Sequence, residues 1–393
     1  MEVLPKDIIS GILSRVTPDS ILTCKLVCKS WKTLLTHVKV GVLFMVQSTE
    51  EKQLGFYYGD FDELIGDCGT FKTTAKKINH LPIVKGGNPL DYEMVGSCNG
   101  LVCLYVPYAD PIYICNPVTG EYVYLPNLDR KVHNIAGGFG YLRTLDVYKV
   151  VRIYYPVCRG RGFVQIYTLG NCRGWREIGE IEHCVDSYPG VLANEILYFR
   201  VDRENNILAL DLASEEFYML PKPSCLSECN TTKTYQLKVM RGYLCIVLSK
   251  KGENVEIWSL QNNCSSIEKN CDSRRWSLDY SMPWFGHPCN FFEPVAFTKS
   301  NKLLVWCNVT TLCCYDPQTR NLRSIVEYDV TFDTIPHINS SVSLKSLGME
   351  ERIKEIEEDP SKRESSKGIL ELPICTMYDD HVLGIVHPSK EEL

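Results

Sequence analysis

The pattern of hydrophobic and polar positions divides the chain about forty residues from its start. Before that point, apolar side chains recur every three or four residues, which is the spacing of one helix face. The first predicted helix carries Ile8, Ile9, Ile12, Leu13 and Val16. Thr17 and Pro18 have the N-cap and first-turn chemistry of a second helix, and Trp31 belongs to a third. Three short helices bury too little surface to be stable alone, so we expect this segment to pack against a partner protein, the following domain, or both.

Strand-like segments take over from about residue 41. Each is rich in Val, Ile, Tyr and Leu, and turn residues separate one segment from the next. Convincing long helical patterns are absent until residue 348. The predicted strands cover 100–106, 111–116, 121–126, 148–155, 164–169, 195–201, 206–212, 215–221, 243–249, 255–260, 302–308 and 311–316.

Several of these strands belong to an internal repeat. In three hairpins the first strand ends in Asn116, Asp211 or Asp316, and a Ser or Thr follows three residues later. Side chains of these types bond the nearby backbone and so favour a turn. The related hairpins span 114–126, 164–179, 208–221, 255–269 and 313–325. Their interval averages about 50 residues, which is typical of a kelch-type blade and predicts a β-propeller of about six blades. An irregular pair of β-sandwiches is the alternative.

Composition narrows the function classes. The chain has 393 residues, 45% of them hydrophobic, so it can bury a large core. Its net charge of −6 argues against nucleic acid as a partner, because phosphate-backbone binders usually carry a basic face. The longest apolar run, Val40–Val46, is far shorter than the roughly 20 residues that span a bilayer. The start lacks the pattern of a signal peptide, so we expect a cytoplasmic or nuclear protein without membrane partners, whose 19 Cys are mostly reduced.

The sequence contains no motif that indicates catalysis, a cofactor or a metal ion. Two C-x₃-C pairs occur, at Cys24 with Cys28 and at Cys225 with Cys229, but no C-x₂-C pair typical of structural zinc sites. The eight His are scattered along the chain, and no spacing brings one beside a nucleophile. We therefore expect no bound cofactor and no metal site.

Glycines cluster at 137–140 without the spacing of a phosphate-binding loop or a Walker lysine. We expect a tight turn between blades at this stretch. Gly96, Gly100 and Gly138 are expected to supply positive φ angles or close packing between blades.

The last fifty residues or so change character again. Residues 348–359 have the pattern of a short charged helix, and 359–368 are polar. Residues 369–378 have strand character. This strand either closes the ring against an early strand or packs outside it.

The N-terminal segment resembles an F-box. The family's Leu-Pro, acidic residue, apolar pairs and basic residue occur in register and are followed by Val-Cys-Lys-x-Trp. The matching positions are Leu4, Pro5, Asp7, Ile8, Ile9, Ile12, Leu13, Arg15, Ser20, Ile21, Leu22, Val27, Cys28, Lys29 and Trp31. Thr17, Asp19 and Thr23 depart from the family's usual residues and are expected to weaken adaptor binding without abolishing it.

The remainder resembles the F-box-associated domain of plant F-box proteins. The similarity is carried by the segments 96–104, 114–126, 137–153 and 255–260. The family places a three-helix F-box first and a propeller-like β-domain after it. The resemblance implies a mainly β fold with an F-box over 1–40, a substrate-recognition propeller over 41–345, and a charged helix with a C-terminal tail over 346–393.

The resemblance also implies a function without catalysis by this chain. The expected role is the substrate-recognition subunit of an SCF-type cullin–RING ubiquitin ligase, which promotes ubiquitination by proximity. The implied partners are an Skp-type adaptor, through it the cullin and RING subunits, and an unknown protein substrate. The adaptor-binding stripe would comprise Leu4, Pro5, Ile8, Ile9, Ile12, Leu13, Leu22, Val27, Cys28 and Trp31, and the substrate-binding loop Trp284, Phe285 and His287. A non-degradative F-box scaffold and a propeller enzyme or sugar-binding protein are the alternatives.

Overall fold

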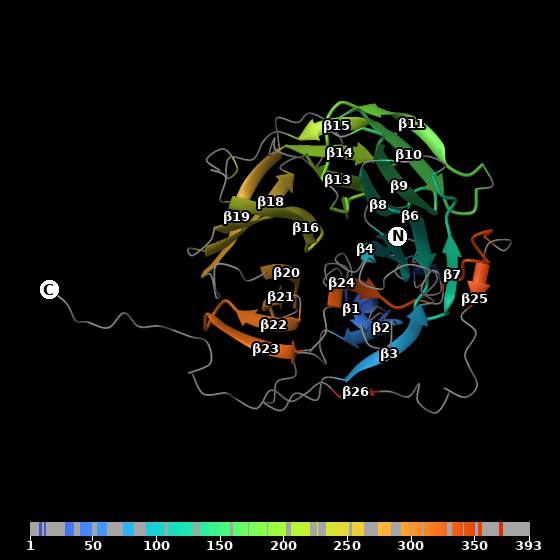
Figure 1. The fold of residues 1–393 in the computed structure, drawn as a ribbon. Coiled ribbons are helices and arrows are strands. Elements are labelled where there is room, and N and C mark those ends of the chain that lie inside the picture. Colours follow the sequence, from blue (N-terminus) through green and yellow to red (C-terminus); the bar gives the residue numbers. More distant parts are fainter. Residues whose placement is uncertain are drawn as a thin grey trace.

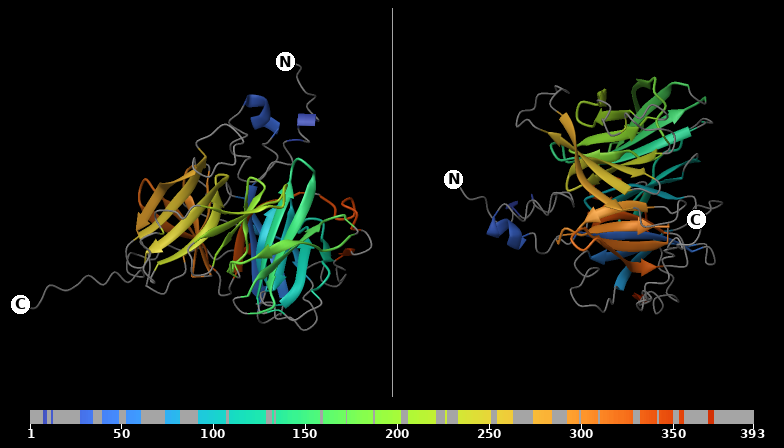
Figure 2. Two further views of the ribbon diagram at one scale, coloured as in Figure 1. Left: turned by 90° about the horizontal axis from the view of Figure 1, so that it is seen from above. Right: turned by 90° about the vertical axis from the view of Figure 1, so that its left-hand side faces the viewer.

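The computed structural model shows a ring of β-sheets (Figure 1), and a short helix, α3 (Lys29–Leu34), projects from one face of the ring (Figure 2). The ring accounts for the strand-like segments, and the helix lies where the third helix is expected. The described residues are 8–9, 12, 28–34, 40–48, 53–60, 74–81, 92–106, 109–128, 132, 134–157, 160–171, 173–186, 188–201, 206–220, 226, 233–250, 254–262, 274–283, 292–298, 300–308, 310–327, 332–340, 342–349, 353–355 and 369–371.

Six antiparallel sheets, here called blades, surround a central axis within the described residues. Blade 1 contains β24 (Phe332–Ile338), β1 (Val40–Ser48), β2 (Gln53–Asp60), β3 (Thr74–Leu81) and β26 (Ile369–Glu371). Blade 2 contains β4 (Glu93–Cys98), β5 (Leu101–Val106), β6 (Ala109–Cys115), β7 (Glu121–Tyr124) and β25 (Ile353–Glu355). Blade 3 contains β8 (Asn134–Leu142), β9 (Val147–Tyr155), β10 (Gly162–Thr168) and β11 (Arg176–Ile181).

The other three blades have four strands each, again given from the axis to the rim. Blade 4 contains β12 (Val191–Ala193), β13 (Ile196–Arg200), β14 (Ile207–Asp211) and β15 (Phe217–Leu220). Blade 5 contains β16 (Lys233–Met240), β17 (Tyr243–Lys250), β18 (Asn254–Asn262) and β19 (Arg274–Pro283). Blade 6 contains β20 (Phe292–Phe297), β21 (Leu303–Cys307), β22 (Thr311–Asp316) and β23 (Asn321–Glu327). The predicted β-propeller of about six blades is confirmed.

A strand from late in the chain closes the ring. β24 is the inner strand of blade 1, where it pairs with β1 from early in the chain, for example Leu43 opposite Ile335. Its flank contacts β4 of blade 2. The strand predicted within 369–378 is present as β26, but it pairs with β3 on the outer edge of blade 1. Of the two places that the sequence left open for it, the outside is therefore the one observed.

The predicted repeat corresponds to the turns between the third and fourth strands of alternate blades. In blade 4 the carboxylate of Asp211 accepts hydrogen bonds from the backbone N–H groups of Ala213 and Ser214, at 2.8 and 3.1 Å. Asn116 in blade 2 and Asp316 in blade 6 make the same pair of bonds. The side-chain chemistry that favoured a turn in the sequence therefore produces the turn.

The glycine-rich stretch 137–140 lies inside strand β8, so the predicted tight turn is wrong. The glycines instead let neighbouring blades approach, because a Cβ on Gly138 would lie 2.8 Å from Leu197 Cδ1. Gly100 has the positive φ angle expected of it, at 86°. Close packing rather than chain reversal explains why glycine occupies a buried inner strand.

The C-terminal segment also departs from expectation. Residues 348–359 were predicted as a charged helix, whereas Ile353–Glu355 form β25, antiparallel to the outer strand of blade 2. The free edge of β7 offers unpaired backbone groups that a short helix could not satisfy. The chain between β24 and β25 is fixed to blade 2, where Asn116 donates hydrogen bonds to the carbonyls of Ser340 and Val342.

Candidate partner-binding surfaces

The helix α3 begins at a cysteine that acts as its cap. Cys28 Sγ accepts a hydrogen bond from the backbone N–H of Trp31 at 3.4 Å, which is the position that an N-cap side chain occupies. Trp31 is half-buried and Cys28 is exposed. Two residues of the Val-Cys-Lys-x-Trp motif, Cys28 and Trp31, are thus brought together by the start of this helix.

Two large apolar side chains of the first predicted helix are left in solvent. Ile8 is 50% exposed and Ile12 is 49% exposed, and both have helical backbone geometry. Because they are four residues apart, they lie on the same helix face. Ile9 is half-buried. The other predicted adaptor-binding residues, Leu4, Pro5, Leu13, Leu22 and Val27, lie outside the described residues.

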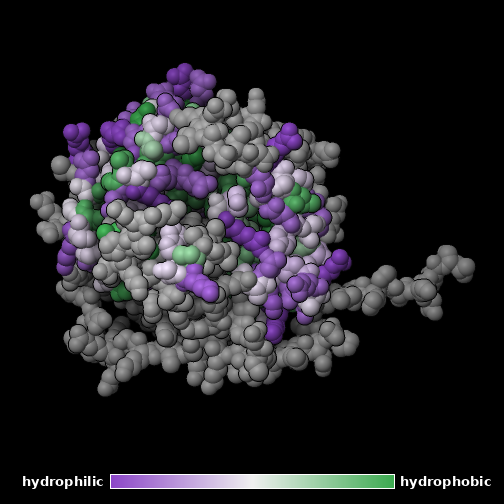
Figure 3. Space-filling view, turned by 180° about the vertical axis from the view of Figure 1, so that it is seen from behind, coloured by the Kyte–Doolittle hydropathy of each residue, from purple (hydrophilic) through white to green (hydrophobic). Residues whose placement is uncertain are grey.

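The ring has two different faces. We call one side the α3 face. It carries the turns between the first and second strands and between the third and fourth strands of each blade. β1 starts at this face, and α3 projects from it (Figure 2). Seen from that side, the described residues are mostly hydrophilic, with small hydrophobic groups between them (Figure 3).

The opposite face, here called the distal face, carries the connections between blades. Strand β19 runs toward this face and ends there at Pro283. The predicted substrate-binding residues Trp284, Phe285 and His287 lie outside the described residues. Tyr188, which is 65% exposed, belongs to the distal face and lies 5.1 Å from the guanidinium carbon of Arg200.

Charged side chains line part of the ring's centre. The inner strands of blades 5 and 6 are joined by an ion pair between Lys238 and Glu293. Burial lowers the pKa of Lys238 to about 8, although the charge of Asp333 opposes this shift. Burial likewise raises the pKa of Asp333, and burial together with Asp333 raises that of Glu93. The sequence gave no signal for this cluster, because its members come from four separate inner strands.

A histidine and a serine meet between blades 1 and 2. Ser97 Oγ and His337 Nδ1 are 2.8 Å apart, which is a distance suited to a nucleophile and a general base. His337 is fully buried, however, and burial lowers its pKa to about 4. An imidazole with so low a pKa is a weak base near neutral pH, and a substrate cannot reach it. The pair therefore joins two blades.

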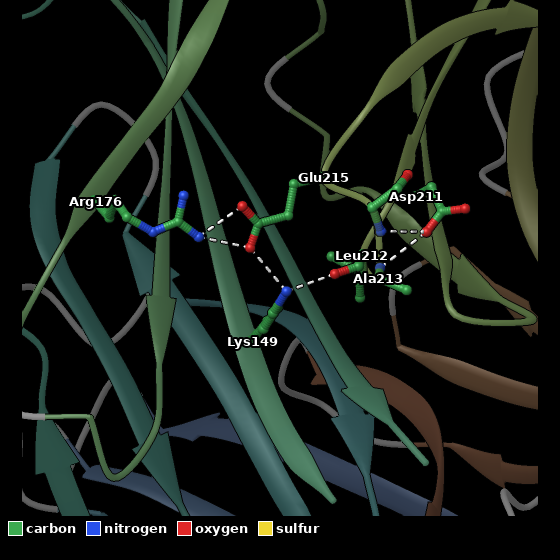
Figure 4. A network of polar contacts seen from close by, with 7 residues as sticks. Lys149, Arg176, Asp211, Leu212, Ala213 and Glu215 are labelled. Atoms are coloured by element: carbon green, nitrogen blue, oxygen red, sulfur yellow. Dashed lines mark hydrogen bonds and ion pairs between the residues drawn. The ribbon is translucent and has the colours of Figure 1, made fainter. Parts of the chain in front are cut away.

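A buried lysine connects blades 3 and 4 on the α3 face (Figure 4). Lys149 Nζ donates to the backbone carbonyl of Leu212 at 2.5 Å and to Glu215 Oε1 at 2.8 Å. Arg176 contacts both oxygens of the same carboxylate at 2.6 Å. Burial opposes ionisation of Glu215, but these hydrogen bonds from Arg176 and Lys149 outweigh it and lower its pKa. The network joins the two blades through one carboxylate shared by two cations.

Glu215 occupies the left-handed region, with φ of 60°, in the turn that Asp211 initiates. The matching turn of blade 2 has glycine at this position, Gly120 with φ of 73°. A side chain in this region costs about 1 kcal/mol. The ion pairs of Glu215 offset that cost. The matching turn of blade 6 also has a side chain at this position, Arg320 with φ of 56°.

Within the part of the chain that the structure describes, no group of three or more His, Cys, Asp or Glu side chains could hold a metal ion. None of the described helices is long and apolar enough to cross a membrane.

Comparison with known proteins adds an independent finding. The profile of the F-box domain matches residues 1–43, and that of the F-box associated beta propeller domain matches residues 72–346. F-box protein At3g07870 of Arabidopsis thaliana is 30% identical over 398 residues, covering 86% of this chain and 91% of the relative. F-box/kelch-repeat protein At3g23880 of the same plant is 25% identical over 279 residues, covering 66% and 75%. F-box protein CPR1, also from Arabidopsis, is 22% identical over 369 residues, covering 83% and 84%.

Proposed function

Because the chain belongs to the F-box proteins with an F-box associated β-propeller domain, we propose that it is the substrate-recognition subunit of an SCF-type ubiquitin ligase. Its F-box binds an Skp-type adaptor, which links it to the cullin and RING subunits. Its propeller holds a target protein. The chain carries out no covalent step, and it raises the concentration of the target near the ubiquitin-conjugating enzyme.

The observation that carries this proposal is the exposure of Ile8 and Ile12 within the matched F-box segment. Two isoleucines on one helix face, half exposed, form an apolar surface that the described part of the propeller leaves uncovered. Aliphatic side chains of this kind contribute to binding when a partner removes them from water. The surface therefore fits a partner that covers it with its own apolar residues.

The geometry of the ring supports a separate role for each face, one for the adaptor and one for the target protein. Because α3 projects from the α3 face, an adaptor bound to the F-box lies on that side of the ring (Figure 2). The distal face then points away from the adaptor and is open to the target protein. Loops can change in sequence without disturbing the blades that carry them, which suits recognition of a particular target.

The test is co-purification of the full chain with an Skp-type adaptor. We expect Ile8→Asp with Ile12→Asp to weaken the complex at least tenfold, because each charge would be buried in the interface. Val157→Asp is the matched control, since Val157 is 67% exposed just after the end of β9, at the distal face. Equal adaptor binding by the wild type and the double variant would overturn the assignment of Ile8 and Ile12 to the adaptor-binding surface.

A second measurement separates the ligase receptor from a non-degradative scaffold. The reconstituted complex, supplied with a bound target and the conjugating enzymes, is assayed for transfer of ubiquitin to the target. Transfer that requires the propeller supports the receptor. A stable complex that binds its target and never promotes transfer would instead support the scaffold.

A further inference from the structure

A hollow of about 490 Å³ lies between blades 5 and 6 near the α3 face. Its walls come from β16, β17, β18 and β19 of blade 5 and from the end of β20 in blade 6. Tyr243 and Leu278 border it and are 46% and 47% exposed. The hollow thus presents apolar surface to solvent at a junction between two blades, and its volume lies in the range of sites that hold small organic ligands.

The hollow is left open by the residue at a β-bulge, where one strand has an extra residue without a partner in the next strand. In β11 and β23 the extra residue is isoleucine, Ile178 and Ile325. Ile178 packs against the core between blades 3 and 4, and Ile325 is buried. In β19 the extra residue is Asp279, which is exposed and lines the hollow. A carboxylate therefore occupies the position where an apolar side chain packs in these two other blades.

One wall of the hollow carries a cation that uses only one of its three nitrogens. Arg241 Nη2 donates to the side-chain oxygen of Asn301 and, at 3.5 Å, to the hydroxyl of Tyr280. The guanidinium carbon lies 4.2 Å from the centre of the Phe297 ring, so neutral groups hold the side chain in place. Among the described residues, no carboxylate pairs with Arg241, and Nη1 and Nε have no acceptor. These open donors suit a carboxylate.

Another wall carries an anion that is equally open. Asp279 Oδ1 accepts one long hydrogen bond, 3.4 Å, from Ser277, and Oδ2 accepts none from the residues that the structure describes. Asp279 and Arg241 line the same hollow and form no ion pair with each other. The hollow thus offers one positive and one negative group, each with unused hydrogen-bonding atoms, beside the apolar side chains of Leu278 and Tyr243.

We propose that this hollow binds a zwitterionic small molecule, of the class of a short hydrophobic peptide. The carboxylate of such a ligand accepts hydrogen bonds from Arg241, and its ammonium group donates to Asp279. Its apolar side chains lie against Leu278 and Tyr243. Because the two protein charges balance, a ligand with a net charge would leave one of them unmatched. This inference goes beyond the role in ubiquitin transfer and does not depend on it.

The separation of the two protein charges favours a peptide over a single amino acid. Arg241 and Asp279 are too far apart to pair, so their ligand must carry its own charges at separate ends. In an amino acid both charges are attached to one carbon atom. In a dipeptide they belong to neighbouring Cα atoms, about 3.8 Å apart across the peptide bond.

The probes are three forms of the dipeptide leucyl-phenylalanine, titrated into the full chain and followed by ligand-observed NMR. The first form has both termini free, the second is N-acetylated, and the third is C-amidated. We expect the free form to bind about fivefold more tightly than either blocked form, since each block removes one exposed charge pair. The two blocks therefore report separately on the two ends of the site.

Two variants assign the ends. Asp279→Asn should remove the preference for the free over the acetylated form and keep the preference over the amidated form. Arg241→Gln should do the reverse. Arg161→Gln and Glu182→Gln are the matched controls, because they remove one charge of each sign at exposed positions of the distal face, and both should keep both preferences.

A third variant tests the space rather than the charges. Asp279→Ile fills the hollow as Ile178 fills its own junction, so it should abolish binding of all three forms while the chain stays folded. A wild type that binds the three forms equally, or binds none of them, would overturn the proposal. Tightest binding of the amidated form would indicate a basic ligand, and tightest binding of the acetylated form an acidic one, and either result would overturn it as well.

Discussion

The junction between blades 3 and 4 and the junction between blades 5 and 6 fill the same kind of space differently. Between blades 3 and 4 the backbones touch, and Gly190 donates a hydrogen bond to the carbonyl of Gly137 at 2.8 Å. Strand β11 contains a β-bulge, and its extra residue, Ile178, packs against the core of that junction. In blade 5 the extra residue of the β19 bulge is Asp279, and a hollow of about 490 Å³ remains there between blades 5 and 6.

The comparison shows that a few positions decide whether a junction is closed or open. Glycine on both inner strands permits direct contact, and an apolar bulge residue fills the rest. Where the bulge residue is the exposed Asp279, the space between the blades is left unfilled. Junctions in one ring of repeated blades can thus differ in packing without any change in topology.

The largest loss of stability is expected between blades 3 and 4, where no space is left for an added methyl group. Gly190→Ala would place a Cβ 2.5 Å from a ring carbon of Phe199, which is itself buried. We expect the free energy of unfolding in urea to fall by about 3 kcal/mol. Gly96→Ala is the control, since its Cβ would lie 3.5 Å from Phe139, an ordinary contact distance. Similar losses in both variants would show that this junction is no tighter than its neighbour.

The next effect concerns the lysine that connects blades 3 and 4. Lys149→Met keeps the buried stem but removes the bonds to Leu212 and Glu215, so unfolding free energy should drop by about 2 kcal/mol. Arg161→Met is the control, because Arg161 is 66% exposed, and its surface ion pairs should contribute under about 0.5 kcal/mol. A Lys149 variant as stable as the control would mean that packing alone holds the junction closed.

A smaller, pH-dependent effect is expected from the carboxylate of that network. The pKa of Glu215 is lowered in the folded state, so its contribution is present above the ordinary pKa near 4.5 and is lost as pH falls through the folded value. Glu215→Gln should therefore cost about 1 kcal/mol at pH 7, and the difference from wild type should shrink below pH 4.5. Urea unfolding at pH 7 and at pH 3.5 measures it. A constant difference would exclude ionisation as the cause.

The smallest effect is a gain in stability rather than a loss, and it is expected at the junction between blades 5 and 6. Asp279→Ile places an isoleucine at the bulge position, where β11 has Ile178 and β23 has Ile325, and we expect unfolding free energy to rise by about 0.5–1 kcal/mol. Thermal unfolding of the variant beside wild type measures the gain. A clear loss of stability would show that the hollow cannot accept the side chain and that the two junctions differ in backbone as well as in side chains.

The sequence predicted the middle strands of the blades better than the inner ones. β9, with VYKVVRIYY, and β17, with YLCIVLSK, are rich in apolar and β-branched residues and are recognisable without a structure. The inner strand β8, with NIAGGFGYL, looked like a turn, and β24, with FDTIPHI, was not recognised. Inner strands face a centre that is partly lined by charged side chains, and they carry glycine where two blades touch. Their sequences therefore lack the usual alternation of apolar and polar residues.

The candidate sites divide in the same way. The F-box motif is local, and its residues could be matched one by one along the chain. The stretch Trp284, Phe285 and His287 stays a prediction. The hollow around Asp279 left no mark in the sequence, because it depends on a bulge and on the alignment of five separate strands.

By itself the sequence determined that the chain has an F-box followed by repeated β-hairpins near a 50-residue period, since Asx turns and apolar strands are local features. Only the tertiary structure decided which strand closes the ring, which junction is tight and which is open. Those outcomes depend on contacts between residues more than a hundred positions apart, such as β24 with β1, and on whether a single side chain fills the space between two blades.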